Sequence, residues 1–246
     1  MIDNLRLSAH RGAQTVAPEN TIAAFSTAVN QGFGAIELDP RFTSDGDIFI
    51  MHDDTVDRTT DGTGPLSDMT ASQVRALEID TGGYPEYAGQ ILRVPSFEEA
   101  VTVIAAGNVV LNVDGSKVDW SNATFTDKIV TTLKNHGLYG RSFFVISDSA
   151  QRAAFSARYP DAILSWLTTS EASLSSAIAE VKSHQRALLS IPETLATASV
   201  IQTLHNTSGV YYQVYNVNTA ESLTRIKQLH VPMAETSTLS PANLVD

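Results

Sequence analysis

Short apolar runs alternate with helix-like segments along the whole chain of 246 residues, and this alternation constrains the fold more than any other feature. The expected strands are residues 5–9, 35–39, 47–52, 109–114, 142–146, 162–167, 187–191, 210–215 and 230–234. The expected helices are residues 21–31, 96–106, 123–135, 150–158, 171–182, 195–206 and 219–229. Strands that alternate with helices predict a parallel sheet with crossover helices. Eight such units close into a (β/α)8 barrel, the TIM-barrel fold of the α/β class, which we therefore predict.

Nine strand candidates compete for eight places in this barrel, so we expect one of them, 187–191 or a neighbour, to lie outside it. The Ser-Asp-Gly-Asp turn signal at 44–47 leaves no room for a helix, which predicts an extended crossover between the second and third strands. Residues 53–95 are rich in Asp, Thr, Gly and Pro, with one short helix expected at 70–77. They predict a small lobe inserted after the third strand. No linker or repeat divides the chain, so we expect one domain over residues 1–246.

The composition argues against several classes of site and partner. The chain has no cysteine, which excludes disulfides, thiol nucleophiles and cysteine–zinc sites. A formal net charge of -11 disfavours nonspecific binding to nucleic acid and docking on anionic membranes. No run approaches the roughly 20 apolar residues that span a bilayer, and residues 1–6 do not resemble a signal peptide. We therefore expect a small-molecule partner, no nucleic acid, no stable membrane insertion and a cytoplasmic location. A periplasmic or secreted location stays open if a leader was removed, and the oligomeric state is open.

Polar residues gather where the first four expected strands end, and catalytic side chains of such barrels lie at those ends. They are His10, Arg11, Glu37, Asp39, His52 and Asp114. Glu37 and Asp39 are two residues apart on a strand, so both side chains point to the same side. Two carboxylates that close repel each other unless they share a cation or a proton. Carboxylates suit a hard cation, arginine suits phosphoryl oxygens and histidine suits proton transfer. The set therefore predicts metal-assisted chemistry on a phosphate ester.

An ordered series of short motifs resembles the glycerophosphodiester phosphodiesterase family. The motifs are AHRG at 9–12, PENT at 18–21, AF at 24–25, ELD at 37–39, SDG at 44–46, HDD at 52–54, DRTTDGTG at 57–64 and VPSFEEA at 94–100. In the second half of the chain, VISD at 145–148 and QVYNVN at 213–218 match only loosely. The resemblance implies a barrel enzyme that hydrolyses deacylated phospholipids to sn-glycerol 3-phosphate and an alcohol.

The resemblance also implies roles for individual residues. It implies that Glu37, Asp39 and the acidic residue that ends the fourth strand, here Asp114, hold one Ca²⁺ or Mg²⁺. It implies that His10 and His52 share general acid and base work. Arg11 would grip the phosphoryl group.

Further residues are candidates for contact with the substrate. We expect Lys117 to reach the phosphate and Glu19 to contact the active site. Trp166 and Tyr215, at strand ends, either form an apolar wall for the leaving alcohol or belong to the core. We expect Arg58 to pair with its neighbour Asp57 and to brace the lobe.

Three stretches depart from the family's pattern. The family's Glu-x-Lys on the fourth strand is replaced by Asp114 with a lysine one residue late, and Val-Asn at 217–218 stands where the family usually has Trp-Thr. The closing Thr-Asp-x-Pro is replaced by Ala-Glu-Thr-Ser at 234–237. These changes motivate one alternative, a catalytically silent binding barrel. A second alternative is a relative of lysophospholipase D or sphingomyelinase D with the same barrel chemistry. Which histidine is the base is open, and so is whether a substrate hydroxyl or water attacks phosphorus; we favour the hydroxyl.

Overall fold

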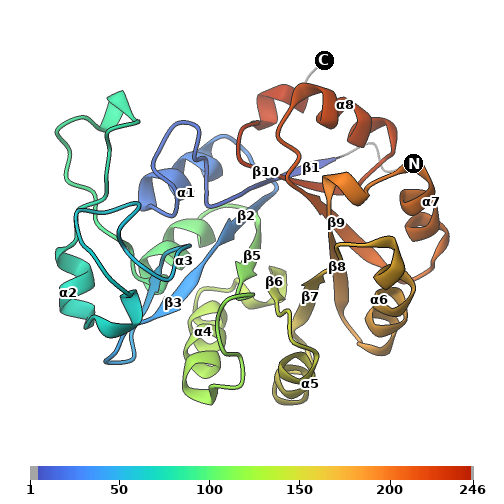
Figure 1. The fold of residues 1–246 in the computed structure, drawn as a ribbon, viewed down its shortest axis with the longest axis horizontal. Coiled ribbons are helices and arrows are strands. Elements are labelled where there is room, and N and C mark those ends of the chain that lie inside the picture. Colours follow the sequence, from blue (N-terminus) through green and yellow to red (C-terminus); the bar gives the residue numbers. More distant parts are fainter. Residues whose placement is uncertain (1–4, 245–246) are drawn as a thin grey trace.

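Residues 5–244 are described by the computed structural model, and their eight parallel strands form a closed barrel with helices outside it (Figure 1). The barrel strands are β1 (Arg6–Ala9), β2 (Ala35–Leu38), β5 (Val110–Asp114), β6 (Ser142–Val145), β7 (Ile163–Leu167), β8 (Ala187–Pro192), β9 (Tyr211–Tyr215) and β10 (Met233–Thr236). They neighbour one another in the order β1-β10-β9-β8-β7-β6-β5-β2, and the pairing of β1 with β2 closes the ring. The predicted (β/α)8 barrel is confirmed.

Helices follow the expected segments closely because each begins at a polar capping residue. They are α1 (Ile22–Asn30), α2 (Ala71–Ala76), α3 (Phe97–Ala105), α4 (Ala123–Asn135), α5 (Ser149–Arg158), α6 (Glu171–Ser183), α7 (Ala198–Asn206) and α8 (Ala220–Gln228). Thr21 before α1 and Ser96 before α3, for example, each accept a hydrogen bond from a backbone N–H of the first turn. Within the described part of the chain, no helix has both the length and the apolar character that a membrane span requires. Residues 1–4, part of the segment searched for a leader, lie outside the described residues.

The segment expected to be the third barrel strand lies outside the barrel. β4 (Ile48–Ile50) pairs antiparallel with β3 (Pro40–Phe42) in a separate two-stranded sheet. The turn at 44–47 closes this hairpin, so the expected extended crossover is wrong. A connection of a few residues can only reverse the chain, because parallel neighbours need a crossover of about a dozen residues or more. The extra candidate is therefore 47–52, whereas 187–191 forms β8 inside the barrel.

The inserted lobe consequently follows the second barrel strand and not the third. It lies at the left of Figure 1, and it contains α2 where a short helix was expected. A separate apolar cluster holds it together, made of Phe49, Met51, Val56, Leu66, Ala71, Val74, Ile79 and Val94. His52 thus belongs to this lobe and does not end a barrel strand.

Inside the barrel, a layer of buried polar side chains replaces the usual branched apolar residues. Its members are Ser8, Asn112, Ser165, Ser190, Gln213 and Glu235. Ser165 and Ser190 share a hydrogen bond of 2.9 Å, and Gln213 Nε2 donates to Ser190 Oγ at 2.9 Å. Their neighbours along each strand, such as Leu164 and Leu189, face the helices and belong to the main apolar core. The barrel interior is therefore polar close to the ends of β2 and β5, where the acidic residues stand.

Candidate functional site

Three carboxylates converge at the C-terminal ends of β2 and β5. Glu37, Asp39 and Asp114 each offer one oxygen, and these oxygens lie within 4.8 Å of one another. Glu37 and Asp39 are only 1% and 3% exposed. The second oxygen of Glu37, Oε1, has no hydrogen-bond partner among the described residues.

This acidic cluster is electrostatically unfavourable without a positive charge. Burial, followed by the charge of Asp39, raises the pKa of Glu37 well above its usual range. Burial, followed by the charge of Asp114, also raises the pKa of Asp39. A divalent cation that prefers oxygen ligands would relieve both effects and would use the unpartnered Glu37 oxygen. The donor set therefore fits Ca²⁺ or Mg²⁺.

The loop after β1 folds tightly onto this cluster. Arg11 has a left-handed backbone, with φ of 56°, and its N–H donates to Glu37 Oε2 at 2.7 Å. Its Nε lies 3.7 Å from Asp39 Oδ2. Gly12 follows with φ of 80°, and a Cβ there would lie 2.7 Å from the Cβ of Ala24 in α1. The sequence His-Arg-Gly thus permits a turn that places the arginine beside two of the acids.

His10 is held from the end of the last barrel strand. Its Nδ1 lies 2.8 Å from the Oγ of Ser237, just after β10, and its backbone oxygen accepts from Gln14 Nε2 at 2.8 Å. Ser237 is fixed in turn because its N–H donates to Asn218 Oδ1 at 2.8 Å. Burial, with the charge of Arg11 next, lowers the pKa of His10 to about 3. The ring is therefore neutral at pH 7, with Nε2 not used by these contacts.

His52 approaches the site from the lobe. Its Nδ1 lies 2.6 Å from Asp53 Oδ1, and its backbone oxygen accepts a hydrogen bond from Arg41 Nη2. The His52 ring is close enough to His10 to contribute to the low pKa of that residue. The structure therefore brings the two predicted histidines together at the end of the barrel where the acidic cluster lies, which we call the barrel mouth. They reach it from different parts of the fold. Asp53 was missed as a partner of His52, and the HDD motif at 52–54 was its signal.

Glu19 reaches the site through two arginines. Its Oε1 accepts from Arg11 Nη1 at 3.0 Å and from Arg58 Nη2 at 2.7 Å. The expected pair of Asp57 with Arg58 is wrong, because the Asp57 carboxylate accepts the N–H of Gly64 at 2.9 Å and closes a local turn. Arg58 is instead free to bridge the lobe and the first loop of the barrel.

Among the expected substrate contacts, Lys117 and Tyr215 lie toward the mouth and Trp166 does not. Lys117 Nζ is 3.8 Å from Asp39 Oδ1, and the Tyr215 hydroxyl is close enough to Glu235 to be affected by its charge. The Trp166 ring lies 4.4 Å from the guanidinium carbon of Arg152 and belongs to the core between barrel and helices. Because side chains alternate along β7, Ser165 faces the barrel interior and Trp166 faces outward. The expectation of a substrate wall is therefore wrong for Trp166, and the core alternative holds.

A fourth carboxylate, Glu235 on β10, stands near the acidic cluster and was not predicted as a site residue. It is 8% exposed, and its Oε2 accepts from Asn112 Nδ2 at 3.0 Å. Burial, followed by the charge of Asp114, raises the pKa of Glu235 to about 8. The changed closing motif at 234–237 was its only signal in the sequence.

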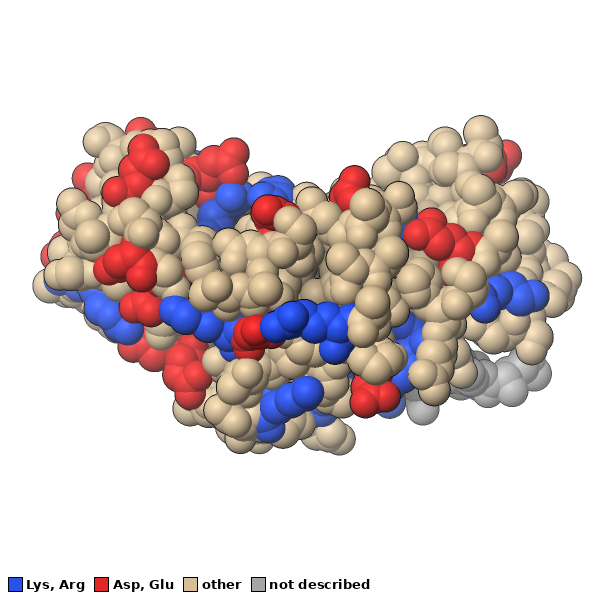
Figure 2. Space-filling model, turned by 90° about the horizontal axis from the view of Figure 1, so that it is seen from below, with Lys and Arg blue, Asp and Glu red and all other residues tan. Residues whose placement is uncertain are grey.

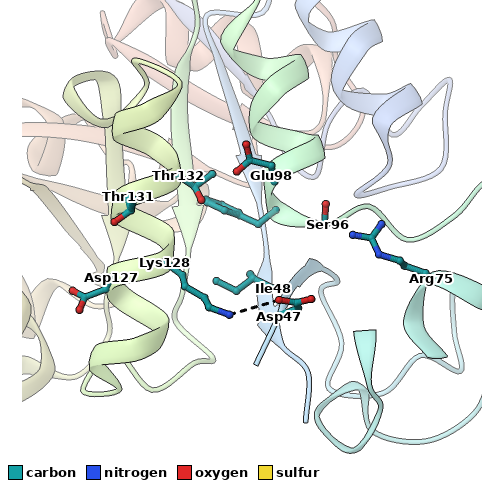
Figure 3. A pocket seen from close by; sticks show the side chains of 10 residues that line it. Asp47, Ile48, Arg75, Ser96, Glu98, Asp127, Lys128, Thr131 and Thr132 are labelled. Carbon is teal, nitrogen blue, oxygen red and sulfur yellow. Dashed lines mark ion pairs between the residues drawn. The ribbon is translucent and has the colours of Figure 1, made fainter. Parts of the chain in front are cut away.

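Outside the mouth, a groove of about 440 Å³ separates the hairpin from α3 and α4 (Figure 3). Lys128 and Asp47 face each other across it at 3.6 Å. Arg75 at its edge pairs with Glu99 at 3.5 Å. In Figure 2, acidic and basic side chains are likewise interspersed over one side of the molecule, whose upper edge is hollowed between two raised ends. Each charged side chain that lines the groove has an ion-pair partner, so we assign it no chemistry.

Comparison with known proteins agrees with this geometry. The model of the Glycerophosphoryl diester phosphodiesterase family matches residues 10–233. Glycerophosphodiester phosphodiesterase 1 of Rattus norvegicus is 44% identical over 112 residues, which are 46% of this chain and 34% of that protein. The glycerophosphodiester phosphodiesterase of Caldanaerobacter subterraneus is 39% identical over 106 residues, or 43% of each chain. The match thus spans between a third and a half of the length of these relatives.

Solved structures show the same fold along nearly the whole chain. A phosphodiesterase of Oleispira antarctica, solved in complex with the product sn-glycerol-3-phosphate, has a TM-score of 0.82 at 22% identity, covering 94% of this chain and 92% of that one. A putative glycerophosphoryl diester phosphodiesterase of Agrobacterium tumefaciens has a TM-score of 0.82 at 20% identity, covering 98% and 96%. At these identities the likeness concerns the barrel architecture.

Proposed function

The chain belongs to the glycerophosphoryl diester phosphodiesterase family, and we propose that its barrel mouth hydrolyses glycerophosphodiesters to sn-glycerol 3-phosphate and an alcohol. One observation carries the proposal: three carboxylates, with an unpartnered oxygen on Glu37, lie beside an arginine and two histidines. This set supplies each group that metal-assisted cleavage of a phosphodiester needs. The Oleispira antarctica phosphodiesterase, which shares the fold, binds sn-glycerol-3-phosphate as product.

Glu37, Asp39 and Asp114 would hold one Ca²⁺ or Mg²⁺. Such an ion, when bound, lowers the pKa of a hydroxyl beside it and offsets negative charge on phosphate oxygens. Arg11 and Lys117 add two positive groups beside Asp39, at 3.7 Å from its Oδ2 and 3.8 Å from its Oδ1 respectively. They are suited to hold the phosphoryl oxygens while the ester reacts.

The surroundings of the two histidines support different roles for them. Burial and the neighbouring charge of Arg11 lower the pKa of His10 and favour its neutral ring, and its Nδ1 faces Ser237 Oγ, so its Nε2 can accept the proton of the attacking hydroxyl. His52 has its Nδ1 on the Asp53 carboxylate at 2.6 Å, which leaves Nε2 to donate a proton to the leaving alcohol. We therefore assign His10 as the base and His52 as the acid.

The attacking group in this proposal is the free glycerol hydroxyl next to the ester. Its oxygen forms a bond to phosphorus, its proton passes to His10, and the bond from phosphorus to the alcohol breaks. The departing alcohol oxygen takes a proton from His52. Water then opens the cyclic phosphate, with the two histidines in reversed roles, and yields sn-glycerol 3-phosphate.

Release of sn-glycerol 3-phosphate by the purified protein tests the proposal. Glycerophosphocholine and glycerophosphoethanolamine would be supplied with Ca²⁺, with Mg²⁺ and with EDTA, and the product would be detected with glycerol-3-phosphate dehydrogenase. We expect release with a cation and none in EDTA. No release under any condition would contradict the proposal. Cleavage of lysophosphatidylcholine in its place would favour the lysophospholipase D alternative.

A further inference from the structure

One arginine of the lobe bonds two carboxylates at once. Arg58 Nε donates to Asp53 Oδ2 at 2.6 Å, and its Nη2 lies 3.2 Å from Asp53 Oδ1. On its other edge, Nη1 donates to Glu19 Oε2 at 3.0 Å and Nη2 to Glu19 Oε1 at 2.7 Å. The planar guanidinium favours such paired bonds, because its donors are fixed in a fork that matches a carboxylate.

Each of these carboxylates holds a different residue of the proposed site. Asp53 Oδ1 lies 2.6 Å from His52 Nδ1 on the lobe side. Glu19 Oε1 accepts from Arg11 Nη1 at 3.0 Å on the barrel side. Arg58 is therefore one residue removed from both the histidine and the phosphate-binding arginine, and it connects them across the boundary between lobe and barrel.

This connection matters because His52 is not carried by a barrel strand. Its distance from groups on β1 and β2 depends on the contacts that fasten the lobe to the barrel. The bridge is partly shielded from water, with Glu19 at 16% and Arg58 at 47% side-chain exposure. Because Arg58 contacts both oxygens of Asp53, it fixes the orientation of that carboxylate, whose Oδ1 lies 2.6 Å from His52 Nδ1.

We propose that Arg58 is a positioning residue that holds His52 and Arg11 in a fixed mutual arrangement, through Asp53 and Glu19. The inference rests on the proposed function, which assigns those two residues to proton donation and phosphate binding. It adds a role that Arg58 performs without touching the substrate.

Substitution of Arg58 by Gln removes the guanidinium fork, and Arg93→Gln is the matched control. Arg93 is also a lobe arginine, 43% exposed in its side chain, and it pairs with Glu78 at 3.2 Å. We expect Arg58→Gln to lower kcat by about 100-fold, as small displacements of a reacting group do, and to change KM less than about threefold. Arg58→Lys, which keeps the charge but not the forked guanidinium, should lower kcat by an intermediate factor. Arg93→Gln should retain wild-type kinetics.

A second readout does not depend on turnover. Nitrogen NMR of the neutral His52 ring at high pH reports which ring nitrogen carries the proton. In the wild-type protein, and in Arg93→Gln, we expect the Nδ1–H form that Asp53 selects. In Arg58→Gln, at a melting temperature close to that of the control, we expect a mixture with the Nε2–H form. If the wild-type protein cleaves no glycerophosphodiester, the proposed function fails, whereas this comparison still decides the role of Arg58.

A double-mutant cycle separates positioning from a general loss of structure. If Arg58 acts through Asp53, the double variant Asp53→Asn, Arg58→Gln should lose no more activity than the more damaged single variant. Additive losses, an unchanged His52 tautomer in Arg58→Gln, or equal effects of the Arg58 and Arg93 substitutions would each overturn the proposal.

Discussion

Replacing Glu235 by Gln should remove much of the pH dependence of stability when no cation is bound. The pKa of this buried carboxyl is raised from 4.5 to about 8. Between these values the folded protein holds a proton that the unfolded chain has released. The contribution to stability is therefore complete below about pH 4.5 and is lost as pH rises through about 8.

The structure also sets the size of the effect. At about 1.4 kcal/mol per pKa unit, a rise of pH from 5 to 9 costs the wild-type protein up to about 4 kcal/mol through Glu235 alone. Glutamine cannot ionise, and its amide oxygen can still accept the hydrogen bond from Asn112 that Glu235 accepts at 3.0 Å. The pKa values of Glu37 and Asp39 are also raised, so these two residues still make the stability of the variant depend on pH. The variant should therefore still lose stability over this pH range, but less than the wild type loses.

Thermal unfolding in EDTA at pH 5 and pH 9 measures the difference. The melting temperature of a protein of this size changes by about 2–4 °C per kcal/mol. Between pH 5 and pH 9, the melting temperature of the wild type should therefore fall by up to about 8–16 °C more than that of Glu235→Gln. The exposed lobe glutamate Glu86 provides a control, because Glu86→Gln should melt like the wild type at both pH values. Equal losses in the wild type and Glu235→Gln would refute the idea that Glu235 is protonated in the cation-free fold.

Further predictions concern the site and the loop that shapes it. His52→Ala should lower kcat by about 10²–10⁴-fold without changing the melting temperature, and a smaller loss in steady-state kinetics would exclude it as the acid. Ca²⁺ or Mg²⁺ at 100 times its dissociation constant should stabilise the fold by about 2.7 kcal/mol, and calorimetry should show weaker binding to Asp114→Asn. Lys117→Met should raise KM by about 10-fold or more through loss of a charged phosphate contact, which initial rates would detect. Gly12→Ala should destabilise by on the order of 2 kcal/mol in denaturant titration, because its φ is 80° and its Cβ would press on α1.

Local sequence patterns were sufficient to predict the barrel. Apolar periodicity located every barrel strand, since each buries one face on the helices, and the capping residues located the helices. The pattern could not show that 47–52 leaves the barrel, because an apolar run looks the same in a hairpin and in a barrel strand. The short turn at 44–47 was the decisive feature, since a connection of that length excludes a parallel neighbour.

Sequence motifs predicted acids and histidines that the structure brings together, but not the groups that orient them. Ser237 meets His10 only because β1 and β10 are neighbours in the closed ring, at a separation of 227 residues. Arg58 meets Glu19 only because the lobe folds back on the first loop. The sequence left Trp166 open between a substrate wall and the core, because the inward or outward direction of a strand residue depends on a register that the apolar run alone does not define.

Direct observation of the reaction by ³¹P NMR tests the central claim most plainly. Glycerophosphocholine would be incubated with cation and with wild-type protein, His10→Ala or His52→Ala, each checked for an unchanged melting temperature. We expect the diester signal to be replaced by that of sn-glycerol 3-phosphate in the wild type and to persist with either variant. A diester signal that persists with the wild type, or disappears as fast with both variants, would contradict it.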